Sequence, residues 1–171
     1  MQKFHNKYRI PSARLQSWDY GSNAAYFITI CTHNMAHFFG DIIDGKMQLN
    51  EIGQLAEKYW MEIPHHFPFV ELGNFVVMPN HTHGILIINK SDDDAPIAPV
   101  QTLHCNVCTI SPNSPIFPKN EKMAKISPKA GTIPTIIRSY KSIVSKNARL
   151  IRPDFNWHPR FHDHIIRDTQ S

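Results

Sequence analysis

Two apolar runs separated by a dipeptide constrain the fold of this chain more than any other feature of its sequence. Residues 72–78 (LGNFVVM) and 81–88 (HTHGILII) are rich in β-branched and aromatic side chains, which is typical of strands. Only Pro79-Asn80 lie between them, which favours a tight turn and an antiparallel pair. The sequence therefore predicts a β-hairpin near the middle of the chain.

Two further strands are predicted on either side of this hairpin. Residues 24–32 (AAYFITICT) form a short, continuous β-branched and aromatic run, which is typical of a strand buried on both faces. In residues 160–167 (RFHDHIIR), apolar and polar side chains alternate well enough to predict a closing strand, and Pro153 and Pro159 precede this stretch.

Two other stretches have the apolar spacing of amphipathic helices. In the first, Asn50 can cap the N-terminus and Pro64 follows the last apolar position. Its apolar residues are Ile52, Leu55, Tyr59 and Ile63. In the second, Thr132 is available as a cap and Pro134 is acceptable in the first turn. Its apolar stripe consists of Ile133, Ile136, Ile137, Tyr140, Val144 and Ala148.

The predicted order of elements is β-α-β-β-α-β, which is the ferredoxin-like plan of the α+β class. In that plan two helices cover one face of an antiparallel sheet, and the other face is free for a ligand. We expect residues 1–23 to form a basic N-terminal arm and residues 24–171 to form one domain. Residues 91–131, which are rich in proline and contain an acidic run at 92–94, are expected to be an irregular insertion.

Composition places the chain among globular proteins. Hydrophobic residues make up 42% of the 171 residues and charged residues 19%, which suits one packed core. No apolar run approaches the roughly 20 residues that a membrane-spanning helix needs, and the N-terminus has no signal-peptide core. Three cysteines are too few for a disulfide framework. We therefore expect a soluble, cytoplasmic protein with reduced thiols and no membrane partner.

The net charge is only +4, but it is unevenly placed along the chain. Residues 1–20 carry +3 and residues 134–171 carry +4, so the middle of the chain is slightly acidic. If the two ends meet in the fold, they create a basic face of the kind that polyanions bind. Nucleic acid is therefore a candidate partner, and a scatter of solvated charges is the alternative.

Among eleven histidines, the pair in His81-Thr82-His83 has the clearest spacing for a metal site. Side chains alternate along a strand, so His81 and His83 leave the same face of the sheet, about 7 Å apart along it. That distance allows both imidazoles to share one divalent ion. The alternative is a pair of half-exposed strand histidines with no ligand.

Residues 75–86 (FVVMPNHTHGIL) resemble the HUH signature of the tyrosine-dependent single-strand DNA transposases, in the REP-associated and related bacterial branch. Three other stretches resemble the same family in the same order: its first strand (25–32), its first helix (50–64) and its last strand (157–167). Thr82 departs from the pattern, because the middle position of the triplet usually holds a bulkier hydrophobic residue.

This resemblance implies a transposase domain that recognises hairpin or single-stranded DNA, and cleaves and rejoins it through a phosphotyrosine intermediate. It assigns Mg²⁺ or Mn²⁺ to His81 and His83, with a further ligand from an oxygen-bearing side chain. Single-stranded or hairpin DNA is the expected partner, and a homodimer is a further candidate assembly.

The family's nucleophilic tyrosine lies on a helix after the last strand, with an amide four residues later, so both are expected beyond Ser171. We consider three explanations: a truncated chain, a noncatalytic DNA-binding relic, or substitution by another tyrosine. Tyr140 is the fallback nucleophile, although its place on the apolar stripe of the second helix favours packing in the core.

Six basic residues are predicted to contact DNA, with a solvated surface as the alternative: Arg138, Lys141, Lys146, Arg149, Arg160 and Arg167. An RRM-like nucleic-acid-binding module is a competing hypothesis, but neither central strand carries a basic-aromatic RNP1-like run. A histidine-metal hydrolase would need a carboxylate beside His81 and His83. Cys105 and Cys108 form half of a zinc motif, which we interpret as a chance loop sequence.

Overall fold

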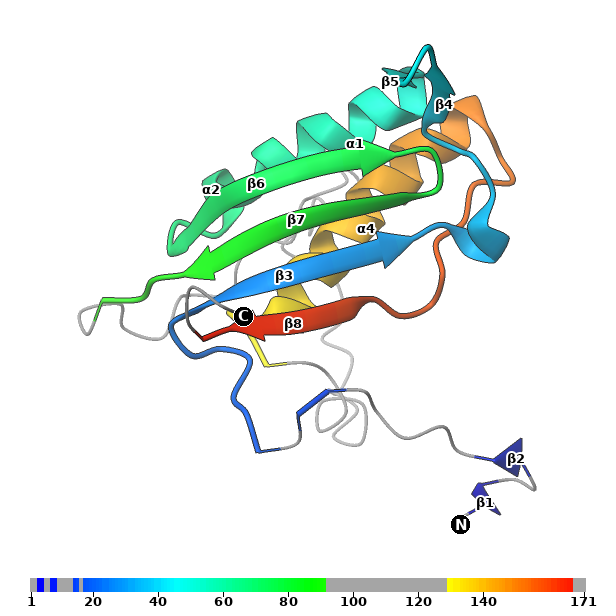
Figure 1. Ribbon diagram of the computed structural model, residues 1–171. Helices are drawn as coiled ribbons and strands as arrows, with labels where there is room; N and C mark the ends of the chain where they lie inside the picture. Colours follow the sequence, from blue (N-terminus) through cyan, green and yellow to red (C-terminus); the bar gives the residue numbers. More distant parts are fainter. Residues whose placement is uncertain (1–2, 5–6, 9–13, 16, 92–128, 168–171) are drawn as a thin grey trace, which may run out of the picture.

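The computed structural model describes residues 3–4, 7–8, 14–15, 17–91 and 129–167 (Figure 1). Most of the predicted insertion, with Cys105 and Cys108, lies outside the described residues, as does the end of the chain from residue 168. No helix in the described part of the chain is long and apolar enough to cross a membrane.

A four-stranded antiparallel sheet is the centre of the fold (Figure 1). Its strand order is β6 (Val70–Met78), β7 (His81–Ile88), β3 (Ala24–Cys31) and β8 (His162–Ile166). The predicted hairpin is confirmed as β6 and β7, and their register brings Met78 opposite His81 across the Pro79-Asn80 turn. Two small two-stranded sheets accompany it: β1 (Lys3–Phe4) with β2 (Lys7–Tyr8), and β4 (Gly40–Ile43) with β5 (Lys46–Leu49).

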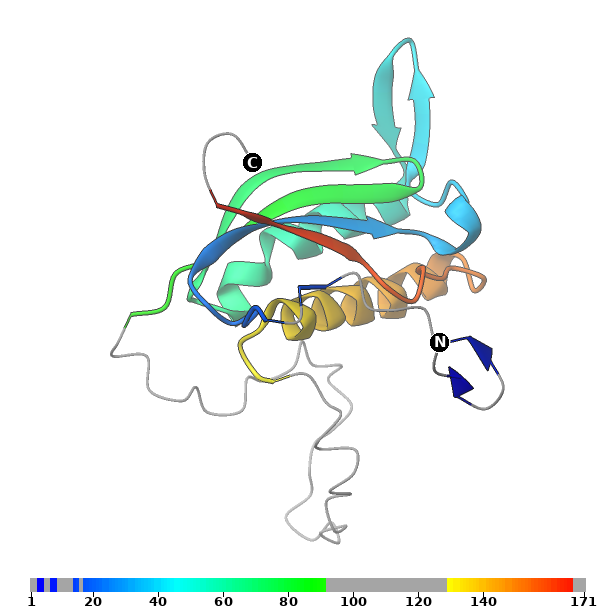
Figure 2. The same cartoon turned by 60° about the horizontal axis from the view of Figure 1, so that its bottom comes forward.

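The helices α1 (Glu51–Met61), α2 (Ile63–His66) and α4 (Ile133–Ile151) lie on one side of the sheet (Figure 2). The Asn50 cap is confirmed, because its Oδ1 accepts hydrogen bonds from the backbone N–H groups of Ile52 and Gly53, both at 3.0 Å. Thr132 occupies the cap position of α4, but its hydroxyl donates to the Lys129 carbonyl instead of capping the helix. The predicted ferredoxin-like α+β arrangement is confirmed.

The hydrophobic core lies between the sheet and these helices. Along β7, Thr82, Gly84, Leu86 and Ile88 are buried and the alternate residues are only half-buried. The prediction that the first strand is buried on both faces was wrong. Tyr26, Ile28 and Ile30 face the helices and are buried, but the alternate residues of β3 are half-exposed because no described helix covers that side. We call this uncovered side of β6, β7, β3 and β8 the open face.

Two parts of the fold were not predicted. The segment through Gly40 and Gly45, for which the sequence predicted no helix or strand, forms the β4–β5 hairpin, which projects from one end of the molecule (Figure 2). Its turn places Asp44 and Gly45 at positive φ, which suits a tight hairpin turn. The second unpredicted feature is an aromatic cluster that closes the same end of the core. It consists of Phe38, Phe39, Phe155 and Trp157.

The described end of the predicted basic arm packs against the domain. Arg14 Nε lies 3.2 Å from the Asp163 carboxylate, and the Arg14 guanidinium lies over the Phe161 ring, 4.4 Å from its centroid. Trp18 donates its indole N–H to the Tyr26 hydroxyl at 3.1 Å. These contacts join the segment before β3 to β8 and to the core.

A glycine in β7 makes room for the largest side chain of the core. Trp60 is fully buried, stacks on Phe75 with 4.6 Å between ring centroids, and meets Tyr140 edge-on. A Cβ atom at Gly84 would lie 2.2 Å from Cζ2 of the Trp60 indole. Only glycine at this position lets the indole rest on the sheet.

Gly84→Ala should therefore lower the free energy of unfolding by about 2 kcal/mol, because overpacking displaces the Trp60 ring. Urea denaturation followed by tryptophan fluorescence would measure the loss. Gly45→Asn is the control, since asparagine tolerates positive φ and no atom lies within 4 Å of a Cβ there. A Gly84→Ala variant as stable as the control would show that the core accommodates the methyl group freely.

Candidate functional site

The side chains of His81 and His83 lie together on the open face. Both are half-buried, whereas Thr82 between them is buried against the helix side. Their ring centroids are 4.6 Å apart and their planes are nearly perpendicular, at 76°. The predicted side-by-side arrangement of the two imidazoles is therefore present in the structure.

Each ring of the pair is held by a hydrogen bond at Nδ1. His81 Nδ1 lies 2.7 Å from the Asn80 Oδ1, and the orientation of that amide is fixed because its Nδ2 donates to the Met35 carbonyl. An amide oxygen only accepts, so His81 carries its proton on Nδ1. His83 Nδ1 lies 2.9 Å from the Thr29 hydroxyl. Neither hydrogen bond uses an Nε2 atom, which is the pattern of second-shell hydrogen bonds in metal sites.

The protonation of His81 also suits a ligand role. Partial burial, and then the neighbouring His83 ring, lower the pKa of His81 below its ordinary value of 6.5. Neutral imidazole is the form that binds a metal ion. At neutral pH His81 therefore has a lone pair available without first releasing a proton.

The pair supplies two nitrogen donors on a rigid strand. In the part of the chain that the structure describes, no group of three or more His, Cys, Asp or Glu side chains could hold a metal ion. The donor set thus fits two positions around Mg²⁺ or Mn²⁺ and leaves the remaining positions to other oxygen atoms. The expected further ligand beyond Ser171 stays a prediction.

Tyr140, the fallback nucleophile, is a core residue. It is fully buried on α4, its hydroxyl donates to the Ala56 carbonyl at 3.0 Å, and burial raises the pKa of its phenol above the ordinary value. Its ring packs against the Trp60 ring on the helix side of the sheet, with 5.3 Å between the two ring centroids. The sheet therefore separates its hydroxyl from His81 and His83, and the structure gives no support to the fallback role.

Two of the basic residues on α4 donate hydrogen bonds to the segment before β8. Lys141 Nζ donates to the His158 carbonyl at 2.7 Å. Arg149 donates to the Phe155 carbonyl and to the Asn156 side chain. Arg138 and Lys146 are exposed on the same helix. All four belong to the helix layer, on the other side of the sheet from the histidine pair.

The other two basic candidates flank β8, which lies at the edge of the open face. Arg160 precedes the strand and Arg167 follows it, and both are exposed. The Arg167 guanidinium lies 5.7 Å from the centroid of the Trp18 ring. Four of the six predicted DNA contacts therefore lie on α4 and two lie beyond the ends of β8, and their roles in DNA binding stay predictions.

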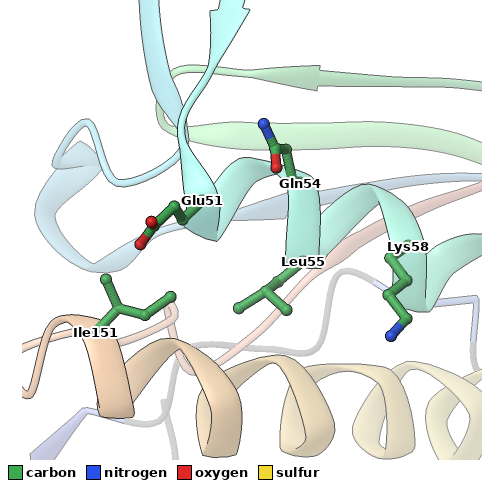
Figure 3. Close-up of a pocket in the computed structure, with 5 residues that line it drawn as sticks. All are labelled: Glu51, Gln54, Leu55, Lys58 and Ile151. Atoms are coloured by element: carbon green, nitrogen blue, oxygen red, sulfur yellow. The ribbon is translucent and has the colours of Figure 1, made fainter.

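A hollow of about 300 Å³ lies elsewhere, in the helix layer (Figure 3). Leu55 of α1 and Ile151 of α4 give it an apolar floor, and its other lining residues are Glu51, Gln54 and Lys58. It contains none of the residues that the sequence predicted to bind metal or DNA or to act in catalysis. The hollow is therefore separate from the candidate site on the open face.

Comparison of sequences relates the chain to a protein of Haemophilus influenzae. No known family profile matches the chain. An uncharacterized protein of Haemophilus influenzae is 36% identical over 163 residues, covering 94% of this chain and 80% of its own length. At this identity and coverage, the chain belongs to the same family as that protein.

Comparison of structures relates the fold to transposases. The structure of a REP-associated tyrosine transposase bound to a REP hairpin aligns with a TM-score of 0.52 and 17% identity. The alignment covers 94% of this chain but 65% of the transposase, so the chain spans just under two thirds of that protein. A candidate transposase from Deinococcus radiodurans aligns with a TM-score of 0.45 and 11% identity, over 93% of this chain and 89% of its own. The first of these alignments shows that the chain has a fold similar to that of the REP-associated transposase.

The pH dependence of stability should report the environment of Lys141. Burial lowers the pKa of its ammonium group from 10.5 to about 8. Between these values the folded protein binds fewer protons than the unfolded chain, so the free energy of unfolding should rise with pH. Urea titrations from pH 7.5 to pH 10.5, flanking the two values, should show this rise in the unmodified chain and a flatter profile in Lys141→Met. Identical profiles would mean that the Lys141 pKa is ordinary.

Proposed function

We propose that this chain is a transposase-like domain that binds single-stranded or hairpin DNA and holds a divalent metal ion, Mg²⁺ or Mn²⁺, at His81 and His83. The proposal extends the transposase-like fold to a specific chemistry on the open face. The hairpin-bound transposase is a fold relative only, so the proposal depends on the residues of this chain.

One observation carries the proposal: two imidazoles meet on an uncovered sheet face with both Nδ1 atoms occupied by hydrogen bonds. Asn80 and Thr29 hold the rings without blocking Nε2. A pair of incidental surface histidines has no need of such partners. Preorganised rings on a central strand are what a metal site requires, because rotamer freedom is already lost before the ion binds.

The residues of the chain have distinct roles in this proposal. His81 and His83 bind the ion, Asn80 and Thr29 orient them, and the open face admits a DNA strand to the same place. When bound there, Mg²⁺ or Mn²⁺ would offset the negative charge of a DNA phosphate and polarise its oxygen atoms. The backbone of β7 keeps the pair rigid because it is hydrogen-bonded to a strand on each side.

A noncatalytic DNA-binding module is the second candidate, and the burial of Tyr140 favours it. None of the open-face positions of β3, β7 and β8 in the described chain holds a tyrosine. Cleavage in this family would require a nucleophilic tyrosine close to the histidine pair. Both candidates share DNA binding and differ in whether a phosphotyrosine bond forms.

Isothermal titration calorimetry with Mn²⁺ tests the metal site. His81→Ala and His83→Ala should each weaken Mn²⁺ binding at least about tenfold, because each removes a ligand. Thr29→Val keeps the shape of the side chain but removes the hydroxyl beside His83 Nδ1, and it should weaken binding about tenfold. His65→Ala changes an exposed histidine on α2 and should bind as the unmodified chain does. If all four variants bound Mn²⁺ with the affinity of the unmodified chain, the site would be excluded.

DNA binding is tested by fluorescence anisotropy with a labelled hairpin that has a single-stranded flank, against a blunt duplex of equal length. The hairpin should bind more tightly, and its affinity should fall as salt rises, because phosphate contacts release counterions. With Mn²⁺ present, the double variant His81→Ala/His83→Ala should bind more weakly than the unmodified chain, and in EDTA the two should bind alike. Equal affinity for hairpin and duplex would contradict the proposed function.

A further inference from the structure

The open face extends beyond the histidine pair onto β3 and β8. The strand register places Thr29 between His83 on one side and His162 on the other. One step along, Phe27 lies between Ile85 and His164. Directly opposed residues in a sheet share a face, so four histidines and one phenylalanine lie on this surface.

The charge of this surface favours an anionic ligand. On the strands of the open face, Glu71 is the carboxylate that the register places there, opposite Ile87 and at the far end from His81. Asp163 of β8 belongs to the other face and pairs with Arg14. His162 and His164 are exposed, and Arg160 and Arg167 flank their strand. A polyanion crossing the open face of β8 therefore meets the imidazoles of His162 and His164, with a guanidinium beyond each end of the strand and no carboxylate among the open-face positions of β8.

Phe27 distinguishes a nucleic acid from other anions. Its ring is only half-buried, although it stands on the second strand of the sheet from one edge. It stacks on His83, with 5.2 Å between ring centroids and 21° between planes. An aromatic ring exposed on a sheet beside polar hydrogen-bonding side chains is the arrangement on which unpaired bases stack. Base-paired DNA could not use it, because its bases are covered by their neighbours.

We propose that a DNA single strand held at His81 and His83 continues across β3 onto β8, where an unpaired base stacks on Phe27 and His162 and His164 contact phosphate oxygens. This inference rests on the proposed function, since it starts from DNA at the histidine pair. It assigns a binding role to the second pair of alternating histidines, His162 and His164, whose spacing on β8 repeats that of the first pair on β7.

The geometry of the sheet makes this path short. Neighbouring strands are about 4.8 Å apart, so β7 and β8 lie about 10 Å from each other across β3. Thr29 is in the middle of this interval and is joined to His83 by its hydroxyl. A flexible strand can therefore contact both histidine pairs and Phe27 at once without leaving the surface.

Photocrosslinking locates the strand on the protein. A hairpin carrying 5-iododeoxyuridine at successive positions of its single-stranded flank is irradiated with the full chain, and the adducts are mapped by mass spectrometry. Adducts are expected at Phe27 and His164. Adducts confined to α4, for example near Arg138 and Lys146, would overturn this path.

Affinity measurements test the same residues independently. Phe27→Leu keeps an apolar side chain and should weaken binding of the flanked hairpin about tenfold, because base stacking on the ring is lost. His162→Ala and His164→Ala should each weaken it about threefold, as expected for single phosphate contacts near charged groups. His65→Ala should have no effect. Circular dichroism melting curves confirm that each variant is folded.

The outcomes separate the two proposals. If the unmodified chain binds the hairpin but Phe27→Leu, His162→Ala and His164→Ala bind equally well, the path onto β8 is wrong and the proposed function stands. If the three variants lose affinity but still bind Mn²⁺ normally, the path is supported as a DNA contact distinct from the metal site. If the unmodified chain binds no single-stranded DNA, both proposals fail.

Discussion

The period of two along β7 is the constraint on which both the core and the candidate site depend. Each residue that enters the core from this strand, such as Thr82 or Leu86, sends its neighbour to the open face. A slip of one residue would place His81 and His83 under the helices and Leu86 in solvent. Because that exchange is costly, the burial of half the strand fixes the position of both histidines.

The helix layer enforces this register through one close contact. Trp60 fills the space above Gly84 and is held between Phe75 and Tyr140. A residue larger than glycine cannot take the place of Gly84 without displacing the indole. A slip of β7 by one residue would bring His83 or Ile85 to this position, so the contact with Trp60 opposes the slip. The same packing that excludes water from the core thus orients the histidine pair on the opposite face.

The sequence predicted the elements that repeat a simple pattern and missed those that depend on distant partners. The β6–β7 hairpin and the Asn50 cap follow from local chemistry, and both were found. The partners of the histidines were not predicted: Thr29 reaches His83 only because β3 pairs beside β7. Phe155 likewise carries no local signal that it closes the core, since its neighbours in the chain are exposed.

DNA binding and DNA cleavage place different demands on this fold. Binding needs an open surface with metal-binding nitrogen atoms and an aromatic ring for base stacking. His81, His83 and Phe27 provide these groups on one face. Cleavage by tyrosine needs a phenol within about 3.5 Å of the reacting phosphorus. The Tyr140 hydroxyl donates to the Ala56 carbonyl on the helix side of the sheet, and the strands themselves lie between it and the open face. A cleaving site would therefore require a tyrosine from outside the described open face, whereas a binding site would not.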